Sequence, residues 1–263
     1  MLQRTRLFDL DLINDANFDA TIDSILRFDT EFDASGDKLP LLFTPNVDDV
    51  VKLNEKRFAF LAGILKRSFY ILPDGQPVVW ASKLFRGKKL KRRLPGSELF
   101  PLLWKEVIAH NKKVMVVAPS PEVGELLKRE YPSLAYYVPP FFSVDKEEEM
   151  QKVNAEASAV FDTIKPDYVF IGIRFPKQNH IALGLIEHVK QEHPEMHMPL
   201  FLLMGASYEF YLNLKKRAPA FWQKIGMEWF YRFTQEPGRL FRRYFIDDMK
   251  FFPIVFREFF KKG

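Results

Sequence analysis

Short apolar runs alternate with longer amphipathic segments along most of this 263-residue chain. The apolar runs have the length and the turn-residue boundaries of buried strands, and they cover Leu41–Thr44, Ser68–Leu72, Lys113–Ala118, Leu134–Val138, Tyr168–Ile173 and Pro199–Met204. The segments between them have helical periodicity and cover Val47–Arg57, Val78–Phe85, Ser97–Asn111, Pro121–Arg129, Lys146–Ile164 and Lys177–Glu192. Strands that are apolar throughout and separated by helices are typical of a parallel sheet. The predicted fold class is therefore α/β, with a Rossmann-like, mostly parallel sheet and helices on both faces.

The two ends of the chain depart from this alternation. The first forty residues are rich in aspartate, and we expect a solvated segment there with one amphipathic helix between Phe18 and Phe28. From Tyr208 onward helical pattern takes over, interrupted by prolines. The sequence therefore predicts a catalytic core over residues 1–210 and a C-terminal helical appendage over residues 211–263.

Charge and composition narrow the class of protein. The chain contains no cysteine, which excludes disulfides, a thiol nucleophile and cysteine-ligated metals. It shows no secretory signal and no apolar run near the roughly 18 residues of a membrane-spanning helix. The net charge is +5, but residues 201–263 carry 12 Lys/Arg against 6 Asp/Glu, while residues 1–200 carry 27 against 28. All the excess positive charge thus lies at the C-terminal end, in a protein that we expect to be soluble or peripheral.

Two loops after predicted strands carry candidate chemistry, because ligands of such folds bind beyond the carboxyl ends of the strands. Thr44-Pro45-Asn46 offers a hydroxyl and an amide, and Pro73-Asp74-Gly75 offers a single carboxylate. A basic stretch then runs from Lys83 to Arg93, ahead of Ser97, which is a candidate helix cap in an anion site. The alternatives are ordinary turn chemistry for both loops and a solvated surface for the lysines.

Other templates are weak or missing. Gln178 opens a predicted helix directly after a strand, where it either binds a ligand or serves the first helical turn. There is no G-x-G-x-x-G and no Walker A sequence, so a dinucleotide cofactor is disfavoured. His193 and His197 are four residues apart without an evident third ligand, so metal binding is not expected. Asp9 and Asp11 form an Asp-x-Asp pair, which we assign to the solvated N-terminal segment.

The C-terminal segment interleaves arginines with aromatic residues. Arg239 and Arg242 are three residues apart and share a face of a predicted helix, where guanidinium groups suit a diphosphate. Basic and aromatic residues on one helix also suit an anionic membrane surface, with Lys250, Arg257, Lys261 and Lys262 as the basic residues. The alternative is a helix that packs on the core. No nucleic-acid motif appears, so nucleic acid is not an expected partner.

Five blocks occur in an order that resembles the WecG/TagA/CpsF glycosyltransferase family: Leu42–Asn46, Leu72–Ala81, Arg93–Leu99, Pro176–Gln178 and Lys216–Tyr244. The resemblance implies an inverting, β-forming bacterial enzyme that moves a sugar from a UDP-sugar to a polyprenyl-diphosphate-linked saccharide in exopolysaccharide or other cell-surface polysaccharide synthesis. It implies no metal or other cofactor, and a cytoplasmic protein that is peripheral on the inner face of the cell membrane.

The resemblance also implies roles for individual residues. Asp74 corresponds to the general base, Thr44, Asn46, Arg93 and Gln178 to substrate-binding residues, and Arg232, Arg239 and Arg242 to the binding site of the nucleotide diphosphate. Inverting transfer needs one carboxylate near the acceptor hydroxyl and positive charge near the departing diphosphate, which agrees with this assignment. Because membrane docking would order the appendage, we expect activity to depend on the lipid acceptor.

Departures from the family pattern leave the donor sugar open. Glu98 stands where the family usually has Asp, and Asn179 stands where it usually has an acidic residue. Both positions belong to the regions where the donor or acceptor sugar would be recognised. The sequence from Asp74 to Trp80 is similar to that of family members in exopolysaccharide synthesis, which favours glucosyl transfer. Transfer of N-acetylmannosamine or its uronate is the alternative. A noncatalytic membrane-associated scaffold of the same fold is the alternative from another class.

Overall fold

A parallel sheet forms the centre of the computed structural model, which describes residues 2–216, 218–219, 221–222 and 225–260, apart from the side chain of Arg239. Within those residues six strands lie in the order β4-β3-β8-β7-β5-β6, and every neighbouring pair is parallel. They are β3 Leu39–Phe43, β4 Ser68–Ile71, β5 Val114–Val117, β6 Ala135–Tyr137, β7 Tyr168–Ile171 and β8 Leu200–Leu203. The predicted fold class is confirmed.

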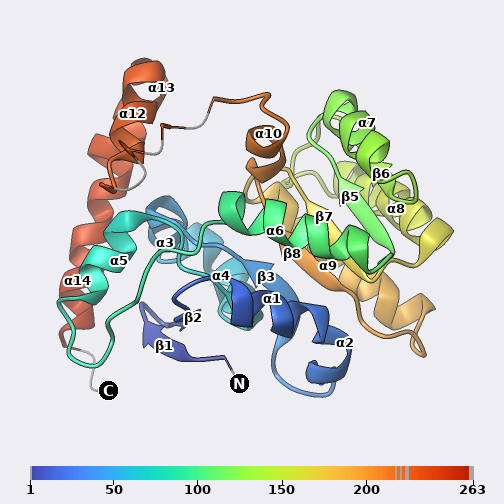
Figure 1. The fold of residues 1–263 in the computed structure, drawn as a ribbon, viewed down its shortest axis with the longest axis horizontal. Helices are drawn as coiled ribbons and strands as arrows, with labels where there is room; N and C mark the ends of the chain where they lie inside the picture. Colours follow the sequence, from blue (N-terminus) through green and yellow to red (C-terminus); the bar gives the residue numbers. More distant parts are fainter. Residues whose placement is uncertain (1, 217, 220, 223–224, 261–263) are drawn as a thin grey trace.

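Alternation of side chains along each strand divides the core into two layers. Leu41 and Phe43 of β3 belong to one buried cluster, whereas Leu42 between them belongs to the other. The first cluster is covered by α3 Val47–Lys52, α4 Ala59–Leu65, α5 Gln76–Ser82, α8 Glu147–Ile164 and α9 Lys177–Glu192. The second is covered by α1 Asp19–Leu26, α6 Gly96–Ala109 and α7 Pro121–Glu130. Both faces of the sheet are thus shielded, as Figure 1 shows.

Several helix boundaries differ from the sequence-based prediction, and the helix expected over Val78–Phe85 spans Gln76–Ser82. The helix expected over Val47–Arg57 ends at Lys52, and a short 3₁₀ turn, η1 (Lys56–Phe58), and α4 follow it. The helix expected to start at Ser97 begins at Gly96 with Pro95 as its N-cap, so Ser97 is not the cap. The fixed φ of proline suits this boundary position.

We expected a solvated N-terminal segment, but the structure has a hairpin there that packs on the core. β1 (Arg4–Leu7) and β2 (Leu10–Ile13) pair antiparallel, and the two turn residues Phe8 and Asp9 have positive φ, as a tight hairpin requires. The apolar side chains of the hairpin, including Leu7 and Leu10, are buried against the sheet layer. The prediction was wrong because it rested on the many aspartates and not on the apolar residues that alternate with polar ones in this segment. The expected amphipathic helix is present as α1, followed by the short α2 (Phe28–Glu31).

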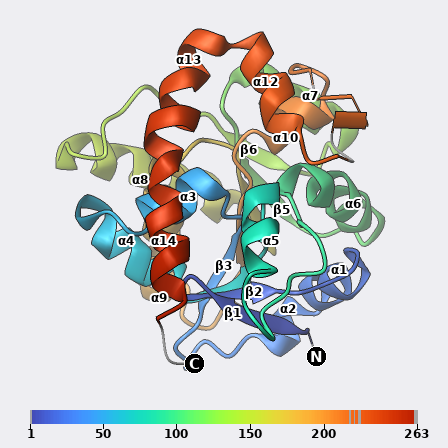
Figure 2. The same cartoon turned by 90° about the vertical axis from the view of Figure 1, so that its left-hand side faces the viewer.

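The C-terminal segment is helical, as predicted, but packs against the core. It contains α10 Ser207–Tyr211, α12 Glu228–Gln235, α13 Pro237–Arg242, the π-helical turn η2 Arg243–Asp247, the 3₁₀ turn η3 Asp248–Lys250 and α14 Phe251–Glu258. Phe251, Ile254 and Val255 of α14 join the buried cluster that α3 and α5 cover. Figure 2 shows α14 beside α5, with α12 and α13 at its other end. The division at residue 210 stays a prediction.

None of the helices in the described ranges is both long enough and apolar enough to cross a membrane. Lys261 and Lys262, which we assigned to a membrane surface, lie outside the described residues.

Candidate active site

A pocket of about 640 Å³ lies between the carboxyl ends of β3 and β4 and the C-terminal segment. The loops after the two strands, together with α5, line one side, and residues from Gly226 to Val255 line the other. Its volume is typical of a site for a small molecule. The parallel sheet and the returning C-terminal helices therefore create a site where the strand-end loops predicted one.

Asp74 lies on the strand-end side of the pocket. Its backbone N–H donates to the carbonyl of Pro45 at 2.9 Å, which ties the loop after β4 to the loop after β3. The next residue, Gly75, has φ of 109°, a conformation that favours glycine at this turn into α5. Burial raises the pKa of the Asp74 carboxyl to about 6, although the nearby Arg93 guanidinium lowers it. A carboxylate of this pKa is ionised at neutral pH and basic enough to accept a proton.

Two arginines from segments far apart in the sequence form ion pairs with one carboxylate, Glu228, close to Asp74. Glu228, in the first turn of α12, accepts from Arg93 Nη1 at 2.9 Å and pairs with Arg232 Nη2 at 3.1 Å. Arg93 also lies 3.6 Å from Glu98 at the start of α6. All but Glu98 line the pocket. The predicted arginines Arg93 and Arg232 are thus brought together, and Glu228 holds them at the pocket wall.

Asn46 caps α3 on the strand-end side of the pocket, the same side as Asp74. Its side chain accepts from the backbone N–H of Asp49, and the Asp49 carboxylate accepts from the N–H of Asn46, which completes a capping box. Burial raises the pKa of Asp49 to about 7. The amide oxygen of Asn46 also accepts from Arg243 Nη2 at 3.3 Å. Asn46 is therefore held by its own helix and by the C-terminal segment together.

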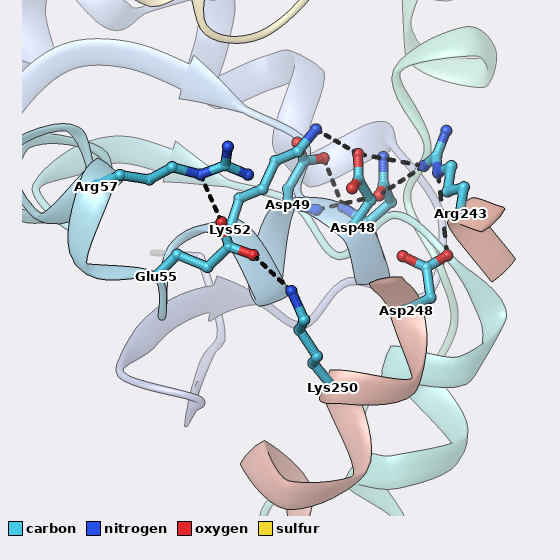
Figure 3. Close-up of polar contacts among 9 residues, drawn as sticks. Asp48, Asp49, Lys52, Glu55, Arg57, Arg243, Asp248 and Lys250 are labelled. Atoms are coloured by element: carbon cyan, nitrogen blue, oxygen red, sulfur yellow. Dashed lines mark hydrogen bonds and ion pairs between the residues drawn. The ribbon is translucent and has the colours of Figure 1, made fainter. Parts of the chain in front are cut away.

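Arg243 connects η2 to α3, as Figure 3 shows. Besides Asn46, it lies 3.7 Å from Asp48 and 3.9 Å from Asp248. Burial raises the pKa of Asp248 to about 6, which Arg243 opposes. Among the described residues, Arg243 Nε has no hydrogen-bond partner although it is buried. The Nε atom is the one that faces Asp248 at 3.9 Å, so its contact in the described part of the chain is this long ion pair.

Of the three C-terminal arginines predicted from the resemblance, only one is seen to line the pocket in the described part of the chain. Arg232 lines the pocket, whereas the side chain of Arg242 is exposed and does not line it. Arg243 occupies the wall instead. The side chain of Arg239 lies outside the described part of the chain. Arg242 ends α13 and Arg243 begins the π-helical turn η2, and helical spacing alone does not predict which of these two adjacent arginines faces inward.

Two predicted substrate-binding residues lie away from the pocket lining. Thr44 packs at the start of α6, where a Cβ on Gly96 would lie 3.3 Å from its hydroxyl. Gln178 is buried in the first turn of α9, and its Oε1 has no hydrogen-bond partner among the described residues. The structure therefore brings together Asp74, Asn46, Arg93 and Arg232, but not Thr44 or Gln178.

The remainder of the pocket is apolar and open to the surface. Trp80 of α5 and Leu84, which follows α5, line this part of the pocket together with Phe245, Met249 and Phe252 of the C-terminal segment, and each of these side chains is exposed by 43 to 64%. A polar end with carboxylate and guanidinium groups thus continues into an apolar end between α5 and α14.

Comparison with known proteins decides the family. The profile of the glycosyl transferase WecG/TagA/CpsF family matches residues 6–263. The chain belongs to this family. A curated relative from Staphylococcus aureus (strain MRSA252), an N-acetylglucosaminyldiphosphoundecaprenol N-acetyl-β-D-mannosaminyltransferase, is 28% identical over 174 residues, which are 64% of this chain and 62% of the relative.

A second transferase of that name, from Staphylococcus aureus (strain MW2), is 27% identical over 184 residues, which are 68% of this chain and 66% of the relative. The matched segments thus span less than two thirds of the length of these curated relatives. Membership of the WecG/TagA/CpsF family confirms the resemblance, whereas the roles of single residues stay predictions.

Sequence reasoning did not assign roles to Glu228 and Arg243, two pocket residues of this family member. A signal existed for Glu228, because it stands four residues before Arg232, the spacing of an ion pair on one helix face. No sequence signal separates Arg243 from its neighbour Arg242, since both belong to one Arg-Arg pair.

Proposed function

We propose that this protein is a glycosyltransferase that moves N-acetylmannosamine from a UDP-sugar to a polyprenyl-diphosphate-linked saccharide, with inversion to a β-linkage. The observation that carries the proposal is the pocket in which Asp74 lies beside the Arg93 and Arg232 guanidinium groups, while the other end is apolar. Family membership and the named activity of the staphylococcal relatives support the reaction class.

The chemistry follows from the polar end of the pocket. The acceptor hydroxyl gives its proton to the Asp74 carboxylate as its oxygen attacks the anomeric carbon, and the bond from that carbon to the UDP oxygen breaks. Attack on the face opposite the leaving group inverts the anomeric configuration. The departing diphosphate gains negative charge, which Arg93, Arg232 and Arg243 are close enough to neutralise.

Glu228 gives the arginine pair a second role. It pairs with both Arg93 and Arg232, so a diphosphate competes with a carboxylate for the same donors. Such competition weakens binding of the spent nucleotide and favours its release. With cationic side chains at this position, we infer that transfer needs no metal ion, and that omission of Mg²⁺ leaves the rate unchanged.

The apolar end supports a lipid-linked acceptor. Trp80, Leu84 and Phe252 form a wall suited to the first isoprenoid units of a polyprenyl chain, next to the diphosphate that joins chain and sugar. Phe256 and Phe260 continue this exposed apolar surface on and after α14. We infer that the C-terminal segment rests on the anionic cytoplasmic face of the membrane, with the protein peripheral to it.

The donor sugar is the point at which the relatives change our expectation. The residues around Asp74 favoured glucosyl transfer, whereas the relatives are named as N-acetylmannosaminyltransferases, which favours the alternative. We therefore propose the N-acetylated sugar as the donor group. No observation supports the noncatalytic scaffold, since the pocket retains its carboxylate and arginines.

The test is transfer to an N-acetylglucosaminyl-diphosphate acceptor with a farnesyl-length chain, read by mass. UDP-N-acetylmannosamine should give product, and UDP-glucose should give little. An acceptor whose chain is replaced by a methyl group should react more slowly at equal concentration. Transfer of glucose alone would contradict the proposed donor sugar. Equal rates for both acceptors would contradict a binding site for the lipid chain. No product with any donor would contradict the proposed glycosyltransferase activity.

A further inference from the structure

A cluster of two histidines and one aspartate lies outside the pocket. His188 of α9 and His193, the residue that ends α9, both reach Asp162 near the end of α8. The Nε2 atoms of the two rings lie 2.8 Å and 2.7 Å from the same oxygen, Oδ1 of Asp162. The three ligand atoms all lie within 4.8 Å of one another. Two imidazoles and a carboxylate that converge in this way form the donor set of a three-residue zinc site.

The two rings are held in place before any ion arrives. Phe161, which is fully buried, packs nearly parallel to the His193 ring with centroids 6.3 Å apart, and edge-on to the His188 ring at 6.1 Å. The side chains of His188 and His193 are exposed by only 18% and 16%. The ring orientations are therefore fixed by packing, which favours a binding site because little freedom is lost on binding.

The carboxylate has to move outward for the cluster to hold an ion. Zinc bonds of about 2.0 to 2.1 Å in tetrahedral geometry put ligand atoms roughly 3.3 Å apart. The carboxylate oxygen of Asp162 is closer than this to both nitrogens, and its side chain is 43% exposed, so it is free to move outward. The exposed side of the cluster leaves room for water as the fourth ligand.

The cluster is remote from the pocket. The strands are parallel, and α8 and α9 lead into the amino ends of β7 and β8, whereas Asp74 follows the carboxyl end of β4. In Figure 1, α14 lies at the left of the molecule and α9 at the right, although both cover the same face of the sheet. An ion here would join the ends of two helices and would not take part in sugar transfer.

We propose that Asp162, His188 and His193 form a binding site for a divalent transition metal of the zinc class, which fastens α8 to the end of α9. Sequence spacing did not predict this site, because the partner ligands of His193 are His188, five residues earlier, and Asp162 on a neighbouring helix, and not His197.

The test uses the full chain without a histidine tag, freed of metal by a chelator and titrated with ZnCl₂ by calorimetry at pH 7.5. We expect saturable binding of one ion per chain. His188→Gln and His193→Gln should each weaken binding by at least about tenfold, since each removes one of three ligands. His197→Gln is the matched control, because His197 is exposed and outside the cluster, and should bind zinc as the parent does.

Replacement of zinc by Co²⁺ gives a second readout, since a tetrahedral ion with two imidazole ligands has a visible absorption that both variants should lose. Glutamine still hydrogen-bonds to Asp162, so thermal unfolding without metal should be similar in parent and variants, which separates a metal site from a structural contact. No saturable binding, or binding unchanged in His188→Gln and His193→Gln, would overturn the proposal. Neither outcome bears on the proposed transferase activity, which depends on the pocket.

Discussion

The two walls of the pocket are held by different forces. On the strand-end wall, Asp74 is tied by backbone hydrogen bonds, its own to Pro45 and that of Leu94 to Pro73 at 2.6 Å. On the C-terminal wall, Arg232 and Arg243 are held by carboxylates at distances from 3.1 to 3.9 Å. Backbone bonds fix a position regardless of charge, whereas ion pairs at a pocket wall are open to competition by an anionic ligand.

This difference matches the two tasks of the proposed reaction. A general base must stay within hydrogen-bond reach of the acceptor hydroxyl, which favours a rigid loop at the end of a buried strand. Groups that bind a diphosphate and release it again need a second partner in the empty state, and Glu228 supplies one. The following changes test whether the two walls have these separate tasks.

Asp74→Asn should have the largest effect. It removes the proposed base with little change in shape, so kcat should fall by about 10²- to 10⁴-fold, while binding of UDP and thermal unfolding stay close to the parent. UDP release and melting curves measure this. Asp23→Asn, on the exposed face of α1, is the control. Full activity of Asp74→Asn would refute the assignment of Asp74 as the general base.

The pH profile should report the same carboxyl. Burial raises the pKa of Asp74 to about 6, and the base acts in its ionised form, so kcat/KM should be level above that pH. As the pH falls below 6 the carboxylate is protonated, and kcat/KM should drop about tenfold per pH unit.

Arg93→Gln should have the next largest effect, because Arg93 belongs to both walls. Its loss removes a close cationic partner of the buried Glu228 and should lower the free energy of unfolding by about 2 kcal/mol. Arg93 also lowers the pKa of Asp74, so the acidic limb of the activity profile should move to higher pH. Urea unfolding and the pH profile measure these changes. Arg92→Gln, which removes a more exposed arginine, should shift neither, and an equal shift would contradict the assignment.

Arg243→Gln should have a smaller effect confined to the C-terminal wall. Loss of one charge-assisted contact to a diphosphate should raise KM for the donor about tenfold with a modest change in kcat. Steady-state kinetics measure this, with Arg242→Gln as the matched control because Arg242 is exposed outside the pocket lining. A larger effect in Arg242→Gln would mean that the family alignment, and not this geometry, identifies the diphosphate ligand.

Lys250→Gln should have the smallest effect. Lys250 pairs with Glu55 at 3.2 Å, but its side chain is 56% exposed, and such surface pairs contribute less than about 1 kcal/mol. Unfolding and activity should both remain near the parent values. A large loss of stability would show that ion pairs, and not the buried Phe251 and Ile254, attach α14 to the core.

The sequence by itself determined the sheet and the place of the proposed base. Apolar runs separated by helices predict parallel strands, and parallel strands bring their carboxyl ends to one edge, so Asp74 and Asn46 were expected together. It did not determine the N-terminal hairpin, because the apolar side chains of β1 and β2 are buried only against a layer formed by later segments.

The tertiary structure alone decided which charged groups meet. Glu228 of α12 meets Arg93, which is 135 residues away, and Asp162 of α8 meets His188 of α9 and His193 directly after it, because the fold packs these segments side by side. Arg243 and not Arg242 lines the pocket because of how the C-terminal segment packs against α3, where Arg243 contacts Asn46 and Asp48. Periodicity specifies which face of an element is apolar, but the contacts of single side chains depend on the rotation and packing of elements that only the folded chain brings together.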